Sequence, residues 1–151
     1  MASFNLAAFG YALAFAAGIS VLVQQVVNAN LRVEIGSPWW AGFASYFVGT
    51  LAMLAMVLVL REPWPPADML HRSTWISWTG GLFGAIYIAL SIFLLPRYGA
   101  ATVIALMVTG QMVGSLVFDH FGLLGVPVHA VNPLRLAGAG MLIGGVALIR
   151  L

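Results

Sequence analysis

The chain has 151 residues, of which 62% are hydrophobic and only 7% are charged. Soluble domains carry about 25% charged residues, so this composition excludes an ordinary soluble domain and favours an integral membrane protein. There is no cysteine, which excludes disulfides and thiolate metal sites. The net charge is only +2 and the six arginines do not cluster, so no nucleic-acid-binding surface is expected.

Five apolar runs have about the length of 20 residues that a helix needs to cross a hydrocarbon core of ~30 Å. They cover residues 4–31, 38–60, 75–95, 99–118 and 133–149. The first run follows no positive residue and is longer than the apolar part of a signal peptide, so we expect it to be retained. The sequence therefore predicts one all-α membrane domain, 1–151, with five transmembrane helices.

Prolines mark several expected helix limits. The second and fifth helices should begin at Ser37-Pro38 and Asn132-Pro133, because each pair places a capping side chain before a proline in the first turn. The third helix should stop before Pro96, because proline removes a backbone donor.

The arginines are balanced between the two faces that five spans would create. One face receives Arg32, Arg97 and Arg150, and the other receives Arg61, Arg72 and Arg135. Orientation follows an excess of basic residues on one side, and here the excess is zero. Either another feature fixes the orientation, or the chain inserts both ways and pairs as an antiparallel dimer, which would recreate the inverted repeat of many transporters.

Small residues recur at four-residue spacing on four of the predicted helices. They are Ala41, Ser45 and Gly49, then Gly80 and Gly84, Gly110 and Gly114, and Gly140 and Gly144. This spacing lets helix backbones approach closely in a membrane, so these residues are interpreted as packing residues. The last helix has no central polar group and is the best candidate for a packing or dimer helix.

Three of the predicted helices each present one line of polar side chains at helical spacing. The first contains Gln24 and Asn28, between Ser20 and Arg32, with Gln25 one step off the line; the third contains Tyr87 and Ser91; the fourth contains Gln111, Ser115 and Asp119. Polar groups in hydrocarbon need partners, so these lines should face the bundle interior or a wet cavity. They could bind a solute, or they could only join helices by hydrogen bonds.

The ionisable residues lie in loops or near helix ends. Asp119 closes the fourth span and is the best candidate for gating or proton coupling; in an antiparallel pair, Glu34 of the other copy would share its face. A metal site is not expected, because Asp68, His71, Asp119, His120 and His129 show no ligand spacing. No nucleophile with a positioned base is visible, so an enzyme is not expected either.

Several stretches give the chain a family resemblance: "QQVVNANLR" at 24–32, "GSPWWAGFASYFVGT" at 36–50, "TGGLFGA" at 79–85, "LPRYGAA" at 95–101 and "GQMVGSLVFDHFGLLG" at 110–125. With these, the chain resembles the YdcZ-like branch of the drug/metabolite transporter superfamily over almost its whole length. The resemblance implies a multi-pass protein of the bacterial inner membrane that looks like one half of an inverted-repeat transporter and works as a dimer or a pair. The chain lacks the glutamate that the four-helix multidrug relatives carry in their first helix.

These observations together predict a secondary transporter for a small polar or amphipathic organic solute. It would work as an antiparallel homodimer, or with a paralogue in place of one copy, and would need membrane lipid but no cofactor or metal. Gln24, Asn28 and Gln111 would bind the solute, and Tyr87, Ser91 and Ser115 would line the path. Gly80 and Gly84 would let helices slide. The alternatives are a structural or regulatory membrane subunit and a channel, the latter disfavoured by the apolar stretch 103–108.

Overall fold

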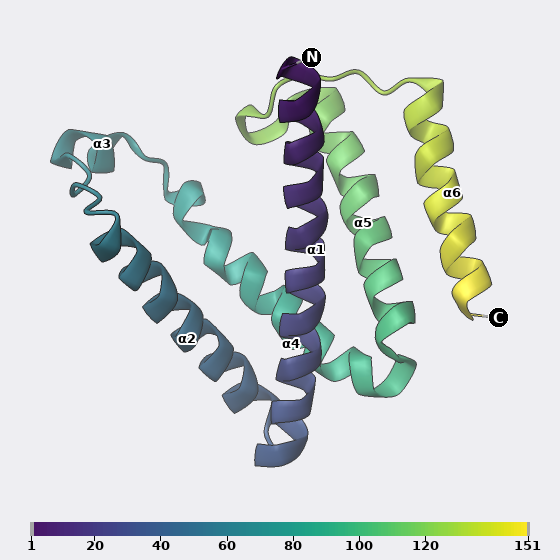
Figure 1. Ribbon diagram of the computed structural model, residues 1–151, viewed down its shortest axis with the longest axis horizontal. Coiled ribbons are helices and arrows are strands. Elements are labelled where there is room, and N and C mark those ends of the chain that lie inside the picture. Colours follow the sequence, from purple (N-terminus) through teal and green to yellow (C-terminus); the bar gives the residue numbers. More distant parts are fainter. Residues whose placement is uncertain (1, 151) are drawn as a thin grey trace. The chain divides into compact units, whose positions relative to one another are not determined.

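The computed structural model describes residues 2–150, apart from the side chains of residues 2–7, 70, 71 and 150; His71 and Arg150, considered above, are outside the described side chains. Every element assigned in the described part of the chain is helical (Figure 1). The elements are α1 (Ala2–Ile35), α2 (Pro38–Val59), α3 (Ala67–Arg72), the 3₁₀ helix η1 (Trp75–Thr79), α4 (Gly80–Tyr98), α5 (Ala100–Phe121), the 3₁₀ helix η2 (Leu123–Gly125) and α6 (Pro133–Arg150).

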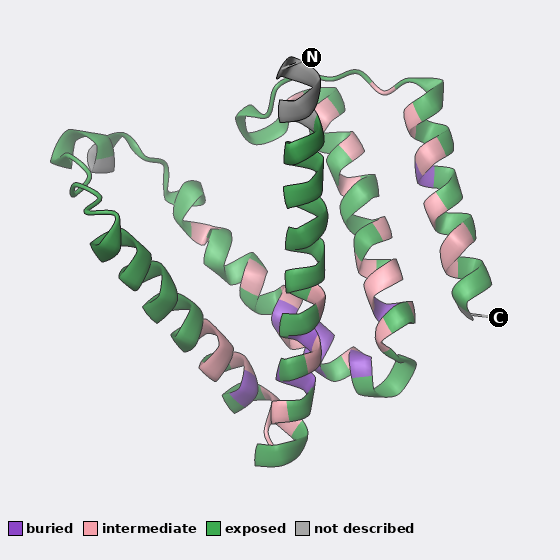
Figure 2. Ribbon diagram, viewed as in Figure 1, coloured by how far each residue is buried: buried purple, intermediate pink, exposed green. Residues whose placement is uncertain are grey.

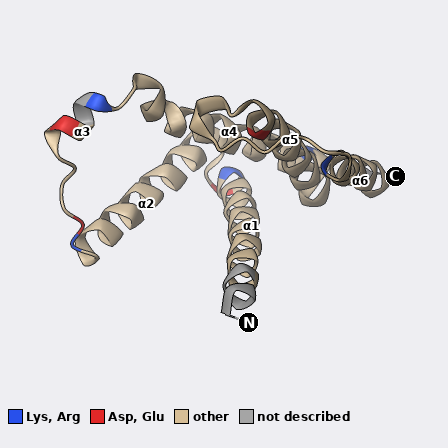
Figure 3. Ribbon diagram, turned by 90° about the horizontal axis from the view of Figure 1, so that it is seen from above, with Lys and Arg blue, Asp and Glu red and all other residues tan. Residues whose placement is uncertain are grey.

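Four helical segments are long and apolar enough to cross a membrane: Ala8–Ile35, Pro38–Val59, Trp75–Tyr98 and Ala100–Phe121. In the described part of the chain, charged residues lie near helix ends and in the connections, with uncharged helix between them (Figure 3). This confirms the all-α membrane class. The fifth expected span, Pro133–Ile149, is also an apolar helix but is shorter, and its membrane crossing stays a prediction.

Two of the expected helix starts are capped by the predicted side chains. The Ser37 hydroxyl accepts a hydrogen bond from the Trp40 backbone N–H at 3.3 Å, and Pro38 follows as the first residue of α2. The Asn132 side-chain oxygen accepts from the Arg135 N–H at 2.9 Å at the start of α6. Each cap satisfies a donor that has no partner within its helix.

The expectation that a helix ends before Pro96 is wrong, because α4 continues through Pro96 to Tyr98. Pro96 has no N–H to donate to the carbonyl of Ile92, four residues earlier. The Arg32 guanidinium takes the place of that donor, with Nη1 2.8 Å from the Ile92 carbonyl oxygen. The same guanidinium lies 5.2 Å from the centre of the Phe93 ring, a cation–π distance. A donor from α1 thus satisfies the Ile92 carbonyl and allows α4 to continue through Pro96.

The chain divides into two compact units, Met1–Leu94 and Leu95–Leu151. In the first unit, buried residues gather where the second half of α1 meets the start of α2 and the second half of α4 (Figure 2). Ala41 on α2 packs there with Ile88 and Ile92 on α4. Ala41, expected as a packing residue, is fully buried.

The second unit contains α5, η2 and α6, with Val103 of α5 and Ala139 of α6 among its buried residues. α5 ends at Gly122, which is left-handed with φ 61°. A Cβ at Gly122 would lie 2.8 Å from Val128 Cγ2, so both the backbone and the space demand glycine.

Candidate functional site

A cavity of about 700 Å³ lies between α1, α2 and α4 in the first unit. We call it the α1–α2–α4 cavity. Its polar lining comes from amide and hydroxyl side chains, and the rest is aliphatic, methionine or glycine: Val21, Gln24, Ser45, Tyr46, Gly49, Thr50, Met53, Leu54, Val57, Gly84, Tyr87 and Ile88. A mostly apolar cavity with a few converging polar groups is the usual form of a small-molecule site.

Two predicted residues of α1, Gln24 and Asn28, meet Ser45 of α2. The Asn28 side-chain nitrogen donates to Ser45 Oγ at 3.0 Å, and the Gln24 side-chain nitrogen donates to the same oxygen at 3.4 Å. A second cavity of about 380 Å³ shares Gln24, Ser45 and Gly49 with the first and also contacts Asn28. The amide–hydroxyl contact therefore lies in the wall between two cavities.

Gln25 is the most buried polar residue of α1 and contacts Tyr87 of α4. Its side chain is fully buried, and its Nε2 donates to the Tyr87 hydroxyl oxygen at 2.5 Å. Its carbonyl oxygen, Oε1, has no hydrogen-bond partner among the described residues. An unpaired buried carbonyl costs about 1–3 kcal/mol, which offsets the gain from the hydrogen bond to Tyr87.

Ser91 and Gly84, both on α4, have different surroundings. Ser91 is fully buried, and its hydroxyl donates to the Ile88 carbonyl oxygen at 2.8 Å within its own helix. A Cβ at Gly84 would collide with the Tyr46 hydroxyl of α2, so the glycine permits a close approach between the two helices. At Gly80 no described atom outside its own helix backbone lies within 4 Å of such a Cβ.

Four predicted residues besides Asp119 lie in the second unit. Gln111 is exposed, and Ser115 donates to the Met112 carbonyl oxygen at 2.8 Å. Neither Gly140 nor Gly144 on α6 has a described atom within 4 Å of the Cβ that a substitution would add, beyond their own helix backbone. The roles predicted for these four residues stay predictions.

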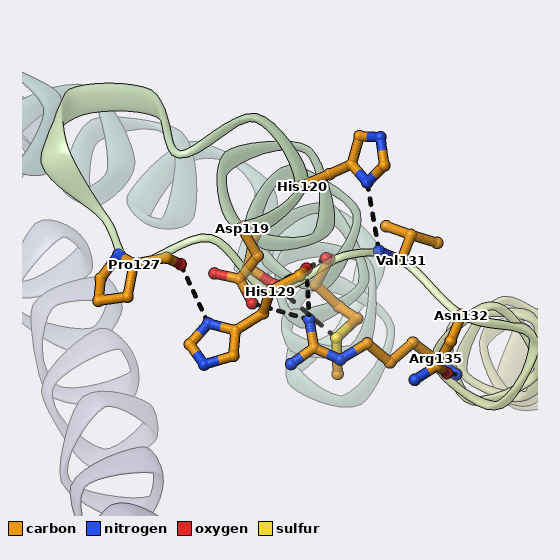
Figure 4. A network of polar contacts seen from close by, with 9 residues as sticks. Asp119, His120, Pro127, His129, Val131, Asn132 and Arg135 are labelled. Carbon is orange, nitrogen blue, oxygen red and sulfur yellow. Dashed lines mark hydrogen bonds and ion pairs between the residues drawn. The ribbon is translucent and has the colours of Figure 1, made fainter.

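Asp119, at the end of α5, anchors the connection to α6 (Figure 4). Its side chain accepts from Arg135 Nη1 at 3.1 Å, an ion pair that leaves both side chains about one-third exposed. Its backbone carbonyl accepts from the His129 N–H at 2.8 Å, and the neighbouring His120 ring accepts from the Val131 N–H at 3.2 Å. The aspartate and histidine that close the fourth predicted span thus hold the following loop. Glu34, the other predicted carboxylate, is exposed near the end of α1.

The structure brings Gln24, Asn28 and Tyr87 of the predicted set to the walls of the two cavities. The sequence reasoning missed the contributions of Gln25 and of the α2 residues Ser45, Tyr46 and Thr50. Ser45 lies on the four-residue line of small residues, and a hydroxyl in that line could have indicated a polar contact. Gln25 stands beside Gln24 in the sequence but gives no periodic signal of its own.

The comparisons with known proteins agree with this architecture. A model of the family described as "Putative inner membrane exporter, YdcZ" matches residues 9–148. The inner membrane protein YdcZ of Escherichia coli (strain K12) is 27% identical over 139 residues, which cover 91% of this chain and 92% of that protein. No solved structure gives a significant match. The family description supports a transporter role and points to a protein that is not an enzyme. The chain belongs to the YdcZ family and is a multi-pass protein of the inner membrane, as the resemblance implied.

Proposed function

We propose that this protein is a secondary transporter that moves a small polar or amphipathic organic solute across the inner membrane by alternating access. The observation that carries the proposal is the α1–α2–α4 cavity, in which Gln24, Ser45 and Tyr87 place polar groups on an apolar wall. Its volume is in the range of ligand sites, which is about 300–1,000 Å³. The family description favours export as the direction.

In this proposal two copies pair in opposite orientations. The balanced arginines support insertion both ways, and two inverted copies would supply the two halves of an alternating-access transporter. Gln111 and Ser115 would complete the solute path in the dimer. Asp119 would gate or couple transport through its ion pair with Arg135, and Glu34 of the other copy would share its face.

The alternative is a structural or regulatory subunit, and the hydrogen bonds from Gln24 and Asn28 to Ser45 also suit that role. Water in the cavity distinguishes the two functions. The chain has no cysteine, so one introduced cysteine is a unique reporter. We expect Thr50→Cys, on the cavity wall, to react with a charged, membrane-impermeant thiol reagent at least about tenfold faster than Leu51→Cys, because the thiolate forms only where water reaches it.

Leu51 is the matched control, since it is the next residue of α2 and is exposed outside the cavity wall. The reaction rates would be followed by gel shift in reconstituted membranes. If Thr50→Cys were as inert as Leu51→Cys, the cavity would be dry and the transporter proposal would be wrong. The structural subunit would then be favoured.

The dimer proposal has a separate test. A reporter that is active only in the periplasm and a reporter that is active only in the cytoplasm, each fused after residue 151, should both give signal, because the arginines impose no preferred orientation. Adding two arginines beside Arg61 should move the signal to one reporter. A single active reporter in the unmodified chain would rule out dual insertion.

A further inference from the structure

The hydrogen bonds around the α1–α2–α4 cavity determine whether its hydroxyl groups are free to donate or to accept. This limits the chemical class of solute that the cavity can bind. The inference rests on the proposed function, because it takes this cavity as the solute site. A hydroxyl has one proton to donate and can accept through its oxygen.

Ser45 has its oxygen occupied on both lone pairs. It accepts from the Asn28 and Gln24 side-chain nitrogens, at 3.0 Å and 3.4 Å. Two other helical serines, Ser91 and Ser115, donate to a carbonyl of their own helix, but Ser45 makes no such bond among the described residues. The Ser45 proton therefore remains available to donate, and Ser45 lines the cavity.

The Tyr87 hydroxyl also has an occupied oxygen and a proton that is free to donate. Its oxygen accepts from Nε2 of the buried Gln25, because an amide nitrogen can donate a hydrogen bond but cannot accept one. The Tyr87 O–H proton then points away from Gln25, and Tyr87 also lines the cavity. This arrangement leaves the Gln25 oxygen unpaired, which costs free energy of folding. In return, Gln25 orients the Tyr87 proton.

The Tyr46 hydroxyl differs from these two, because its proton already makes a hydrogen bond. Its hydroxyl donates to the Gly81 carbonyl oxygen at 3.4 Å. The cavity thus offers the protons of Ser45 and Tyr87, and that of Thr50, beside one amide oxygen from Gln24. Its lining side chains are all uncharged. An ion entering such a space would lose its hydration without gaining an opposite charge.

We infer that the cavity selects uncharged, largely apolar solutes that carry a hydrogen-bond acceptor such as a carbonyl oxygen, and that Tyr87 and Ser45 donate to this acceptor. Gln25 is a positioning residue in this arrangement, since it acts through Tyr87. Organic cations without an acceptor are poor solutes for this cavity.

Three probes of similar size separate these classes: N,N-dimethylbenzamide is a neutral acceptor, phenyltrimethylammonium is a cation, and isopropylbenzene is apolar. Each is tested for slowing the reaction of Thr50→Cys with the thiol reagent in reconstituted membranes. We expect the benzamide to protect the cysteine best. In the Tyr87→Phe background the concentration that half-protects should rise about tenfold, the equivalent of one lost hydrogen bond. Tyr46→Phe should give a smaller change.

Protection by the cation in preference to the benzamide, or equal protection in the Tyr87→Phe background, would overturn the inference while leaving solute binding, and so the proposed function, in place. A reactive cysteine that none of the probes protects would overturn it as well. A cysteine that never reacts would refute the proposed function itself, and the inference with it.

Discussion

Replacing Arg32 with methionine should lower the free energy of unfolding by about 1–3 kcal/mol, because it leaves the Ile92 carbonyl without a donor. Most of this loss should disappear when Pro96 is replaced by alanine. The Pro96→Ala change would restore the backbone N–H that an α-helix normally supplies to the carbonyl four positions earlier. In the Pro96→Ala background the remaining cost should be the cation–π contact with Phe93, about 0.5–1 kcal/mol.

The measurement is a double-mutant cycle by chemical or thermal unfolding in lipid nanodiscs, which isolates the coupling between the two positions. Arg97→Met is the matched control, since Arg97 is also near the end of α4 but no hydrogen bond or ion pair involves it among the described residues. An equal loss from Arg32→Met in both backgrounds would show that the arginine does not replace the missing donor.

Replacing Gln25 with methionine should keep the free energy of unfolding or raise it by up to about 2 kcal/mol, while it weakens solute binding. The change removes an unpaired buried oxygen that costs about 1–3 kcal/mol, against one lost interhelical bond of about 1 kcal/mol. Asn28→Leu is the contrasting variant, because it breaks the bond to Ser45 without relieving an unpaired atom, and it should destabilise.

Melting temperatures and solute protection of Thr50→Cys would be measured on the same preparations. A stability gain with weakened binding is the behaviour of a residue that is kept for function at the expense of stability. If Gln25→Met were destabilised as much as Asn28→Leu, Gln25 would be a structural residue only.

The broad architecture follows from features that can be read locally. Apolar length places the long helices, and the caps at Ser37 and Asn132 place two of their starts, because both signals involve neighbouring residues. The passage of α4 through Pro96 could not be predicted in this way. The donor that permits it is Arg32, which is 60 residues from Ile92 in the sequence.

The candidate site was predictable only in part, for reasons of helix geometry. Periodicity identified the line of Gln24 and Asn28, but Gln25 lies about 100° around the helix, where it contacts α4 in place of α2. Residue size identified Ser45 as a packing residue, yet size does not show whether a hydroxyl has a partner. Gln111 and Ser115 are not among the residues that line the α1–α2–α4 cavity, so their roles stay predictions.

Gly84 has a consequence for the shape of the α1–α2–α4 cavity. The Tyr46 hydroxyl occupies the space in which any side chain at position 84 would begin, and both residues line the α1–α2–α4 cavity. A methyl group there would turn the phenol ring away from α4 and change the shape of the cavity. The hydrogen atom that serves as the side chain of Gly84 therefore helps to set the molecular size that the cavity can accept.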